Sequence, residues 1–587
     1  MEDNTAFIIN RVFRRLVVPT TLSTVAAIVS TLINVLLIAH FTGASGLAVA
    51  TLFIPLLTIW GCIYEGMGIG AVSIFTKNLG RGTIEKGKIL VAKSNTIVLC
   101  LSVILALAGL LFSLFITAQT LGISQEQFND AIWYARIMFI STIPMVMSNY
   151  LLFLARADSG QNISALANTI LIVLNTGLNI LFLGVLDIGV QGAALSMLIA
   201  SSASLIMILI CFQRGKYTLK LRFMLPDGSA IRTLSRYTLN SASDNIADFL
   251  LALYINITVL VCFGLEVASI IYIINYILMF VMFWGLGIAY STGPMLGVYS
   301  GEKNNTAIKM IARKGLVSAL AVGIVLALLI AVFAKTIAVD VFNFEYEQLT
   351  AQCVAAIRWF CLSIPFYMVN VMLIHYCQQL EKFKISLLLT ITSNLLLPMI
   401  FCTIAIATDV PAVIWWGFLP SYLIALLGWG VFMRIKKRRE HLDSILCLPA
   451  YVSPFKVSMH FLIRPDEHHA IEDYQDMAAV FLAHHHVDAS VIRRATLAME
   501  EIIAFVEKTN QRKNGYTAIE LGICKESGVR LLVKLDNEHI DIKNISKRNL
   551  YMWDDMLSLH VLQSLSTELK YQRVLSLNTF DITIEPR

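Results

Sequence analysis

Long apolar runs alternate with short polar loops from the start of the chain to about residue 433, after which the composition becomes that of a soluble domain. A helix needs roughly 20 apolar residues to cross the hydrocarbon core of a bilayer, and these runs reach that length. The pattern predicts twelve membrane-spanning helices, at about residues 16–40, 46–75, 89–116, 131–155, 163–185, 189–213, 240–263, 267–297, 310–333, 354–379, 384–408 and 411–434.

The two halves of this apolar region repeat one another. The stretch GMGIGAVSIFTKNLGRG at residues 66–82 returns as GLGIAYSTGPMLGVYSG at residues 285–301. Other residues recur at nearly the same separation, among them Gly43 and Gly264, Arg136 and Arg358, Asn149 and Asn370, and Asp187 and Asp409. We therefore expect two parallel six-helix repeats, related by an axis along the membrane normal, with a site between them that either face can reach in turn.

The fold class expected is an all-α polytopic membrane bundle of 12 transmembrane helices in two parallel six-helix repeats, followed by a soluble α/β sandwich domain. The expected divisions are a cytoplasmic N-terminus at 1–15, a first lobe at 16–213, a cytoplasmic linker at 214–237, a second lobe at 238–438 and a cytoplasmic domain at 450–587. The linker contains the turn sequence PDGS.

Charge sets the orientation. The chain is 57% apolar and 14% charged, and its net charge of +6 divides unevenly. The part before Pro449 holds 29 Lys and Arg against 20 Asp and Glu, and the rest holds 16 against 19. Of those 29 basic residues, 26 fall on one side of the predicted bundle, which indicates that both termini are cytoplasmic in a multi-pass protein of the cell inner (plasma) membrane. No basic patch suited to nucleic acid stands out.

Acidic residues inside the apolar runs are the first functional candidates, because an ionisable group in lipid is costly and usually has a purpose. Glu65 stands mid-helix beside three glycines and is a candidate for proton or cation handling; the alternative is a neutral acid hydrogen-bonded to a neighbouring helix. Asp244 and Asp248 share one helical face, where they either hold a cation together or lie in the headgroup layer at a helix start.

Buried amides and a histidine are the second group of candidates. Their members are Asn34, Asn149, Asn175, Asn179, Asn370 and His375. Amides in membrane helices usually form interhelical hydrogen bonds, and the alternative is contact with substrate or coupling ion. His375 is either a proton relay or a hydrogen-bonded core histidine.

Three motifs carry a resemblance to a known family: the spaced loop glycines after the second helix, RADSGQNISALAN at 156–168 and LNILFLGVLDIGVQGAALS at 178–196. Over about residues 8–438 the chain resembles the multidrug and toxic compound extrusion (MATE) family. The resemblance implies export of organic, often cationic, compounds in exchange for protons or sodium. Asn34 stands where relatives commonly have an aspartate, and Leu183 where an acid is often found, so the resemblance leaves coupling to Glu65 or to the pair Asp244 and Asp248.

The region 450–587 predicts a strand at 456–463, two helices within 466–510, a hairpin at 517–535, a helix at 553–567 and two final strands. This order resembles the histidine-kinase-like ATPase fold, especially anti-sigma-factor kinases. The resemblance places Glu501 and Asp536 at nucleotide-contacting positions. Phe505, however, replaces the magnesium-binding asparagine, Glu538 replaces a loop glycine, and Met556 and Ser558 stand in the lid. We therefore expect a catalytically inactive domain, with nucleotide binding the weaker alternative to a protein-binding, regulatory role.

The sequence thus favours a secondary active exporter of small organic substrates, coupled to H⁺ or Na⁺, without catalytic residues, cofactor or metal. The run His484-His485-His486 lacks a second ligand group at metal spacing and indicates a solvated face. Two alternatives stay open. One is a flippase for lipid-linked substrates of the same superfamily, and the other is a membrane ligand sensor that signals through its C-terminal domain to a cytoplasmic protein partner.

Overall fold

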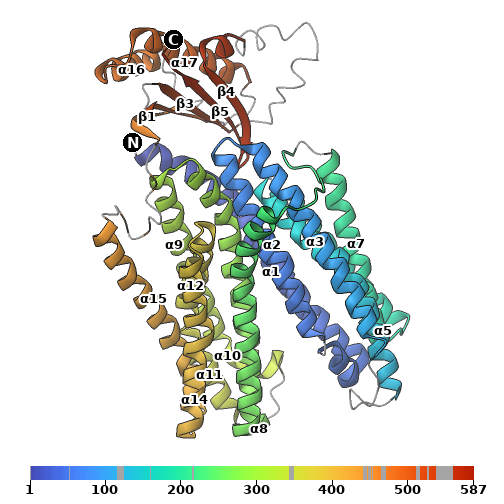
Figure 1. The fold of residues 1–587 in the computed structure, drawn as a ribbon. Coiled ribbons are helices and arrows are strands. Elements are labelled where there is room, and N and C mark those ends of the chain that lie inside the picture. Colours follow the sequence, from blue (N-terminus) through green and yellow to red (C-terminus); the bar gives the residue numbers. More distant parts are fainter. Residues whose placement is uncertain are drawn as a thin grey trace.

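The computed structural model describes residues 2–51, 53–115, 125–158, 160–214, 217–342, 349–440, 444, 446, 451, 454–463, 471–509, 516–524, 528–536 and 560–586. A helical bundle of two lobes fills most of this range, and a small sheet with its own helices caps one end (Figure 1). We call the residues from 454 onward the tail, and the end of the bundle beneath them the tail side.

The first lobe is built from helices that follow the predicted runs closely. Its elements are α1 (Glu2–Thr51), α2 (Ile54–Gly80), α3 (Ile84–Phe112), α5 (Gln125–Ala157), α6 (Gln161–Asn179), the π-helical η1 (Ile180–Val185) and α7 (Val190–Arg214). The predicted N-terminal segment 1–15 is helical from Glu2 and continuous with α1, so no loop separates it from the lobe.

The second lobe repeats this arrangement. Its elements are α8 (Gly228–Gly301), α9 (Asn305–Val332), α10 (Ala334–Thr336), η2 (Ile337–Val341), α11 (Thr350–Cys361), α12 (Ile364–Gln379), α13 (Phe383–Ile391), η4 (Thr392–Leu396), α14 (Leu397–Thr408) and α15 (Ala412–Glu440). Helix α8 begins within the predicted linker, directly after Asp227.

The helix count differs from the twelve expected. Within the described residues, ten helices are long and apolar enough to cross a membrane, and the pair α11 and α12, bent by 44°, raises the number to eleven. The two predicted helices at 240–263 and 267–297 lie on either side of Gly264, a non-helical residue at which two helices join to make the 74-residue α8. The difference therefore lies in how one long, broken helix is divided.

Two pairs of residues preserve the internal repeat in their backbone geometry. Gly43 in α1 and Gly264 in α8 have φ of 69° and 79°, with ψ near 180° in both, and each breaks its long helix. Asp187 and Asp409 also match, with φ of 48° and 55°. Such conformations are rare outside glycine, so their recurrence at equivalent positions supports a duplicated architecture.

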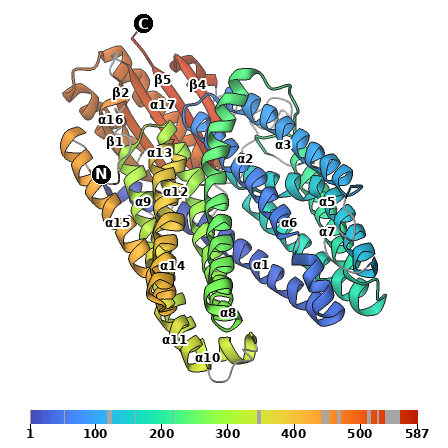
Figure 2. The same ribbon diagram turned by 60° about the horizontal axis from the view of Figure 1, so that its bottom comes forward.

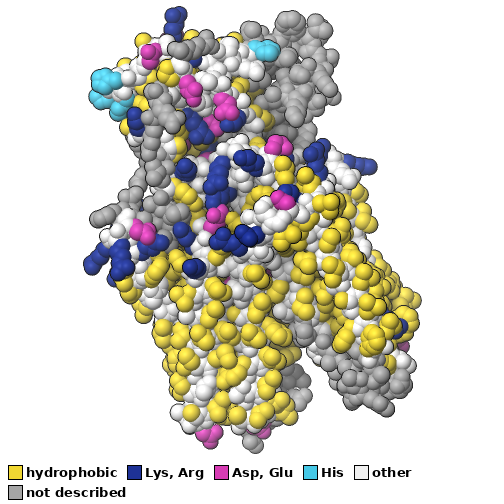
Figure 3. Space-filling view, viewed as in Figure 1, with side chains coloured by type: hydrophobic (Ala, Val, Ile, Leu, Met, Phe, Trp, Pro, Cys, Tyr) yellow, Lys and Arg dark blue, Asp and Glu magenta, His cyan; other side chains and the backbone are white. Residues whose placement is uncertain are grey.

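The lobes meet at the tail side and diverge toward the other end (Figures 1 and 2). Helix α2 of the first lobe crosses α8 closely there, because glycines remove the side chains that would separate them. A Cβ atom at Gly80 would lie 2.0 Å from the carbonyl oxygen of Val298, and one at Gly301 would lie 2.3 Å from that of Lys77. Figure 3 shows apolar side chains along the sides of both lobes, with Lys and Arg gathered near the tail, as expected for a membrane-type fold.

The tail is a five-stranded antiparallel sheet with two long helices on one face. Its strands are β1 (Phe455–Ile463), β2 (Thr517–Cys524), β3 (Val529–Leu535), β4 (Glu568–Val574) and β5 (Leu577–Ile584), in the order β1-β2-β3-β5-β4. Helices α16 (Ile471–His484) and α17 (Ala489–Thr509) share an apolar core with the sheet. The predicted strands and these helices are confirmed; of the expected helix at 553–567, only residues 560–565 lie within the described range as helix.

Candidate functional site

A cavity of about 160 Å³ lies between the two lobes. Both lobes supply its wall, so any movement of one lobe against the other changes it. The polar side chains in the wall are Thr24, Tyr64, Glu65, Asn149, Arg156 and Asn168 from the first lobe and Asp244, Asn245, Asp248, Tyr290, Tyr367, His375 and Asn394 from the second. Three of the predicted acids, Glu65, Asp244 and Asp248, therefore face one space.

The carboxylate of Glu65 on α2 is held by two side chains of α8. Asn245 donates a hydrogen bond of 2.8 Å from Nδ2 to Oε2, and the hydroxyl of Tyr290 donates to Oε1. Tyr290 in turn packs edge-on against Phe153, with ring centroids 4.9 Å apart. Glu65 is thus hydrogen-bonded to a neighbouring helix across the lobe boundary, an arrangement that both interpretations of this acid share.

Asp244 belongs to a hydrogen-bonded chain within the second lobe. Gln378 donates from Nε2 to Oδ2 of Asp244 at 2.7 Å, and the hydroxyl of Thr390 donates to Oδ1. The side-chain oxygen of Gln378 lies 2.9 Å from Nδ1 of His375, so this ring nitrogen must be the donor. Gln378 therefore connects the predicted histidine to one of the predicted acids.

Asp248 lies one helical turn from Asp244, as the sequence predicts, and faces the same cavity. Arg156 stands in the opposite wall, where its Nε donates to the hydroxyl of Ser164 at 2.9 Å and its guanidinium lies over Phe153. The charged groups of the described wall are three carboxylates and one guanidinium. The described wall therefore holds more acidic than basic side chains.

The predicted amides fall into separate places. Asn149 reaches the cavity, although its Nδ2 donates to the carbonyl of Met145 in its own helix at 2.9 Å. Asn34 and Asn179 bond each other inside the first lobe, outside the described cavity wall, and Asn175 lies in the same lobe. Among the described groups, none donates to the buried Oδ1 atoms of Asn175 and Asn179.

Asn370 has a structural role in this conformation. Its Nδ2 donates to the carbonyl oxygens of Phe366, at 3.1 Å, and Tyr422, at 3.2 Å, and so connects α12 with α15. It does not belong to the described cavity wall. The interhelical interpretation of such amides therefore applies here.

The tail candidates lie far from the cavity in the sequence and in the fold. Glu501 is a half-buried residue of α17. Asp536 follows β3 and is buried, and its carboxylate pairs with Arg11 at 3.0 Å and Arg15 at 3.2 Å, both from α1. The position that the resemblance assigns to nucleotide thus contacts the bundle in this structure.

Sequence reasoning did not single out Asn245, Tyr290, Gln378, Thr390 or Asn394, and it included Arg156 only as the first residue of the motif at 156–168. Gln378 stands three residues after His375, and this spacing places both on one helical face, which is a usable signal. Tyr290 and Thr390 carry no such signal, because their partners come from other helices.

The MatE family model matches residues 19–181 and 244–404, which is more than half of the chain and leaves the tail outside the match. A relative from Bacillus subtilis (strain 168), the probable multidrug resistance protein YoeA, is 21% identical over 349 residues, covering 57% of this chain and 73% of that protein.

Solved structures agree with the family match. An outward-facing multidrug resistance MATE transporter of the MOP superfamily superposes with a TM-score of 0.68 and 22% identity, over 73% of this chain and 96% of that chain. A MOP superfamily transporter from Pyrococcus furiosus gives a TM-score of 0.66 and 21% identity, over 73% and 97%. The chain therefore belongs to the MATE family and is a membrane transporter.

Proposed function

We propose that this protein is a secondary active efflux transporter that exports organic or cationic compounds in exchange for protons or sodium. The observation that carries the proposal is the meeting of Glu65 from the first lobe with Asp244 and Asp248 from the second around one cavity. Carboxylates in a partly buried cavity bind a cation strongly only if they are ionised, and they release it when protonated or when another cation competes. Substrate and coupling ion would therefore exclude each other, which is the requirement for exchange.

The size of the cavity supports a rocking mechanism. At about 160 Å³ it is smaller than the roughly 300 Å³ at which ligand pockets for drug-sized molecules begin. An organic substrate thus needs wider separation of the lobes. Because Asn245 and Tyr290 of α8 bind Glu65 of α2, such separation would also change the surroundings of the carboxylate.

The arrangement proposed in the bilayer has twelve crossings, with α8 crossing twice around Gly264. At about 1.5 Å per residue, 74 residues are far longer than one crossing requires. The tail side is proposed to face the cytoplasm of a plasma-membrane protein, because the basic residues gather there (Figure 3). The name of the Bacillus subtilis relative, a probable multidrug resistance protein, supports multidrug cargo.

The tail is proposed to be a regulatory, non-catalytic module that also binds a cytoplasmic protein. Its likeness to the histidine-kinase-like ATPase fold stays a prediction. Phe505 lies fully buried against Phe580, with ring centroids 5.8 Å apart, and it leaves no polar ligand for magnesium at this position. This supports the expectation that no nucleotide cofactor is turned over.

Reconstituted vesicles test the proposal. The purified protein is placed in liposomes, a sodium or a proton gradient is imposed, and movement of ethidium is followed by fluorescence. Movement that requires one gradient supports the exporter. Binding without movement would favour a ligand sensor, and movement of a lipid-linked compound without ethidium movement would favour a flippase.

A further inference from the structure

The two faces of the tail sheet have different environments. Along β3, Val529, Leu531, Val533 and Leu535 point into the core shared with α16 and α17. Residues of the opposite parity, including Lys534, point to the other face because side chains alternate along a strand. That face lies on the bundle at the tail side (Figure 1), so the sheet is a docking surface as well as a fold element.

The centre of the sheet is attached to the second lobe. The Nζ atom of Lys534 lies 2.9 and 2.8 Å from the two carboxylate oxygens of Glu302, which directly follows α8. The ammonium group also lies over the ring of Tyr299, 4.5 Å from its centroid. Lys534 is only 8% exposed, and the nearby carboxylates raise its pKa despite its burial. This is a buried ion pair, so removing one partner leaves an uncompensated charge.

The edge strand β4 and the end of the central strand β3 are attached to the first lobe. Gln572 of the edge strand β4 is buried and donates from Nε2 to the carbonyl of Leu79, the penultimate residue of α2, at 3.1 Å. Asp536, just after β3, pairs with Arg11 and Arg15 of α1. Asp536 follows the central strand β3 and Gln572 lies on the edge strand β4, so one hydrogen-bonded sheet contacts both lobes.

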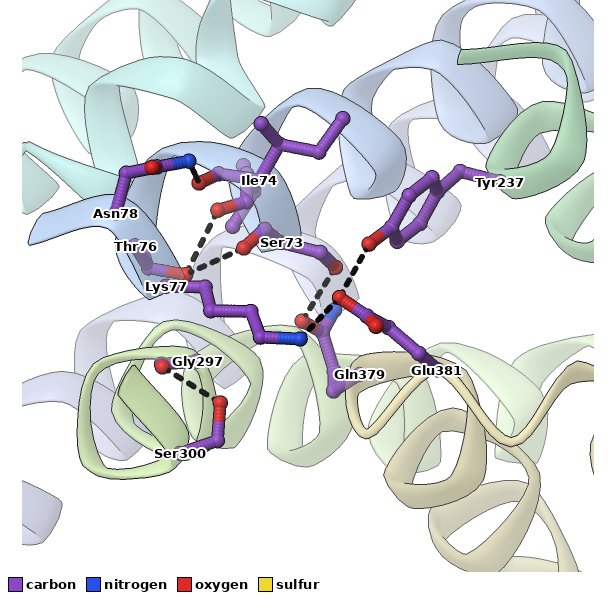
Figure 4. Close-up of polar contacts among 11 residues, drawn as sticks. Ser73, Ile74, Thr76, Lys77, Asn78, Tyr237, Gly297, Ser300, Gln379 and Glu381 are labelled. Atoms are coloured by element: carbon purple, nitrogen blue, oxygen red, sulfur yellow. Dashed lines mark hydrogen bonds and ion pairs between the residues drawn. The ribbon is translucent and has the colours of Figure 1, made fainter. Parts of the chain in front are cut away.

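Directly beneath the sheet, the lobes contact each other through their own side chains (Figure 4). Lys77 of α2 pairs with Glu381, which follows α12, and Ser73 donates to the side-chain oxygen of Gln379 at 2.7 Å. Tyr237 of α8 also donates to Glu381, at 2.6 Å. The bond of Tyr237 lies within the second lobe. Opening of the tail side has to break the contacts of Lys77 and Ser73 and, in addition, detach the sheet from one lobe.

We propose that the tail is a clamp that holds the tail side of the bundle closed. Before the lobes separate there, the tail must release either Glu302 of the second lobe or Leu79 and Arg11 of the first lobe. This inference rests on the proposed function only in requiring that the lobes move. The clamp makes the tail a control point: any partner that engages the same face of the sheet, and so competes with the bundle, favours opening.

Distance measurements between spin labels test the clamp. Lys86 at the start of α3 and Lys309 at the start of α9 are both exposed and lie on different lobes, so cysteines at these positions in an otherwise cysteine-free full-length chain report tail-side separation. Lys534→Glu breaks the ion pair with the second lobe. Asp536→Arg weakens the attachment to the first lobe, because it places a positive charge beside Arg11 and Arg15, while Gln572 still bonds Leu79. We call these two the detaching variants. Arg493→Glu is the matched charge reversal on the exposed side of α17.

Both detaching variants are expected to raise the ratio of long to short distances about tenfold, because a broken buried pair shifts the equilibrium strongly. Arg493→Glu is expected to leave the wild-type distribution, and exchange of the pair, Lys534→Glu with Glu302→Lys, to restore it. A variant whose tail unfolds also loses the clamp and must open as well. Unchanged distances in both detaching variants overturn the inference.

Ethidium transport by the same samples separates this inference from the proposed function. If the distances shift but no variant transports ethidium, the clamp proposal stands and the exporter proposal fails. If ethidium is transported but the distances are identical in all variants, the exporter proposal stands and the clamp proposal fails.

Discussion

Asn245 donates a hydrogen bond of 2.8 Å to the carboxylate of Glu65, and the two residues belong to different lobes. The contact exists only while α2 and α8 lie side by side. It therefore links the environment of Glu65 to the relative position of the lobes, as the proposed ion-driven exchange requires.

Replacing Asn245 tests this coupling. Asn245→Ala is expected to slow gradient-driven transport about tenfold, since a hydrogen bond to a charged group contributes about 1.5–3 kcal/mol. Initial rates of ethidium movement in vesicles measure it. Asn370→Ala is the matched control: it removes an amide that bonds backbone carbonyls away from the cavity wall, so it should lower stability and leave the rate per folded molecule unchanged. Equal rates for both variants would contradict the assignment.

Neutralising the second-lobe acids tests the charge of the cavity. Asp244→Asn and Asp248→Asn are each expected to weaken binding of ethidium about tenfold, because each removes one negative charge from a partly buried wall. Binding of a neutral dye of similar size should stay the same. Asp340→Asn, at an exposed position in η2, is the control and should bind both dyes as the wild type does. A loss that is equal for charged and neutral dyes would point to altered shape instead.

The two helix-breaking glycines give a prediction about stability. A Cβ atom at Gly43 or Gly264 would meet nothing within 4 Å, so only the backbone conformation opposes a side chain there. Gly43→Ala and Gly264→Ala are expected to destabilise the protein by about 1–3 kcal/mol each. Thermal unfolding in detergent measures this.

Gly177→Ala is the control for those glycines. It too has open space, but it lies within α6 at helical φ, so alanine should be neutral or stabilising by up to about 1 kcal/mol. If all three variants have the same stability, the positive φ at Gly43 and Gly264 is not the reason that glycine occupies these positions.

Asp158 gives a pH dependence outside the membrane-spanning helices. Burial raises its pKa from 3.8 to about 7. The hydrogen bond of 2.6 Å that its carboxylate accepts from the backbone N–H of Leu219 lowers the pKa, but by less than burial raises it. The folded protein therefore binds this proton more tightly than the unfolded chain. The contribution to stability is greatest below about pH 4 and declines as the pH rises toward about 7.

Asp158→Asn is expected to flatten the pH dependence of the melting temperature between about pH 4 and 7, because asparagine keeps an acceptor for Leu219 and carries no charge. Melting curves across that range measure it. Asp187→Asn, at an exposed left-handed position, is the control and should keep the wild-type slope. An unchanged slope in Asp158→Asn would show that this group does not titrate with folding.

The repeat and most helices could be predicted because their signals are local. Spaced glycines and apolar runs of spanning length appear directly in the chain, and Gly43 and Gly264 indeed occupy equivalent breaks. The number of helices was harder to predict, because the two helices on either side of Gly264 follow one another without a loop and together make α8.

The site could be predicted only in part. Glu65, Asp244 and Asp248 stand out because acids are rare in apolar runs, and they do share a cavity. Their partners do not stand out: Tyr290 is 225 positions from Glu65 and is one of many tyrosines. The docking of the tail was equally hidden, because Lys534 and Glu302 are ordinary charged residues 232 positions apart.

The most direct measurement is ethidium transport in sealed vesicles under a sodium or proton gradient, comparing the wild type with Glu65→Gln. The amide keeps the size of the side chain and can still accept a hydrogen bond, but it cannot hold an exchangeable proton or a negative charge. We expect gradient-dependent transport by the wild type and none above the gradient-free rate by Glu65→Gln, although ethidium still binds, more weakly, through the remaining carboxylates Asp244 and Asp248. Transport by Glu65→Gln at the wild-type rate, with the same dependence on the gradient, would contradict the proposal that Glu65 couples transport to the gradient.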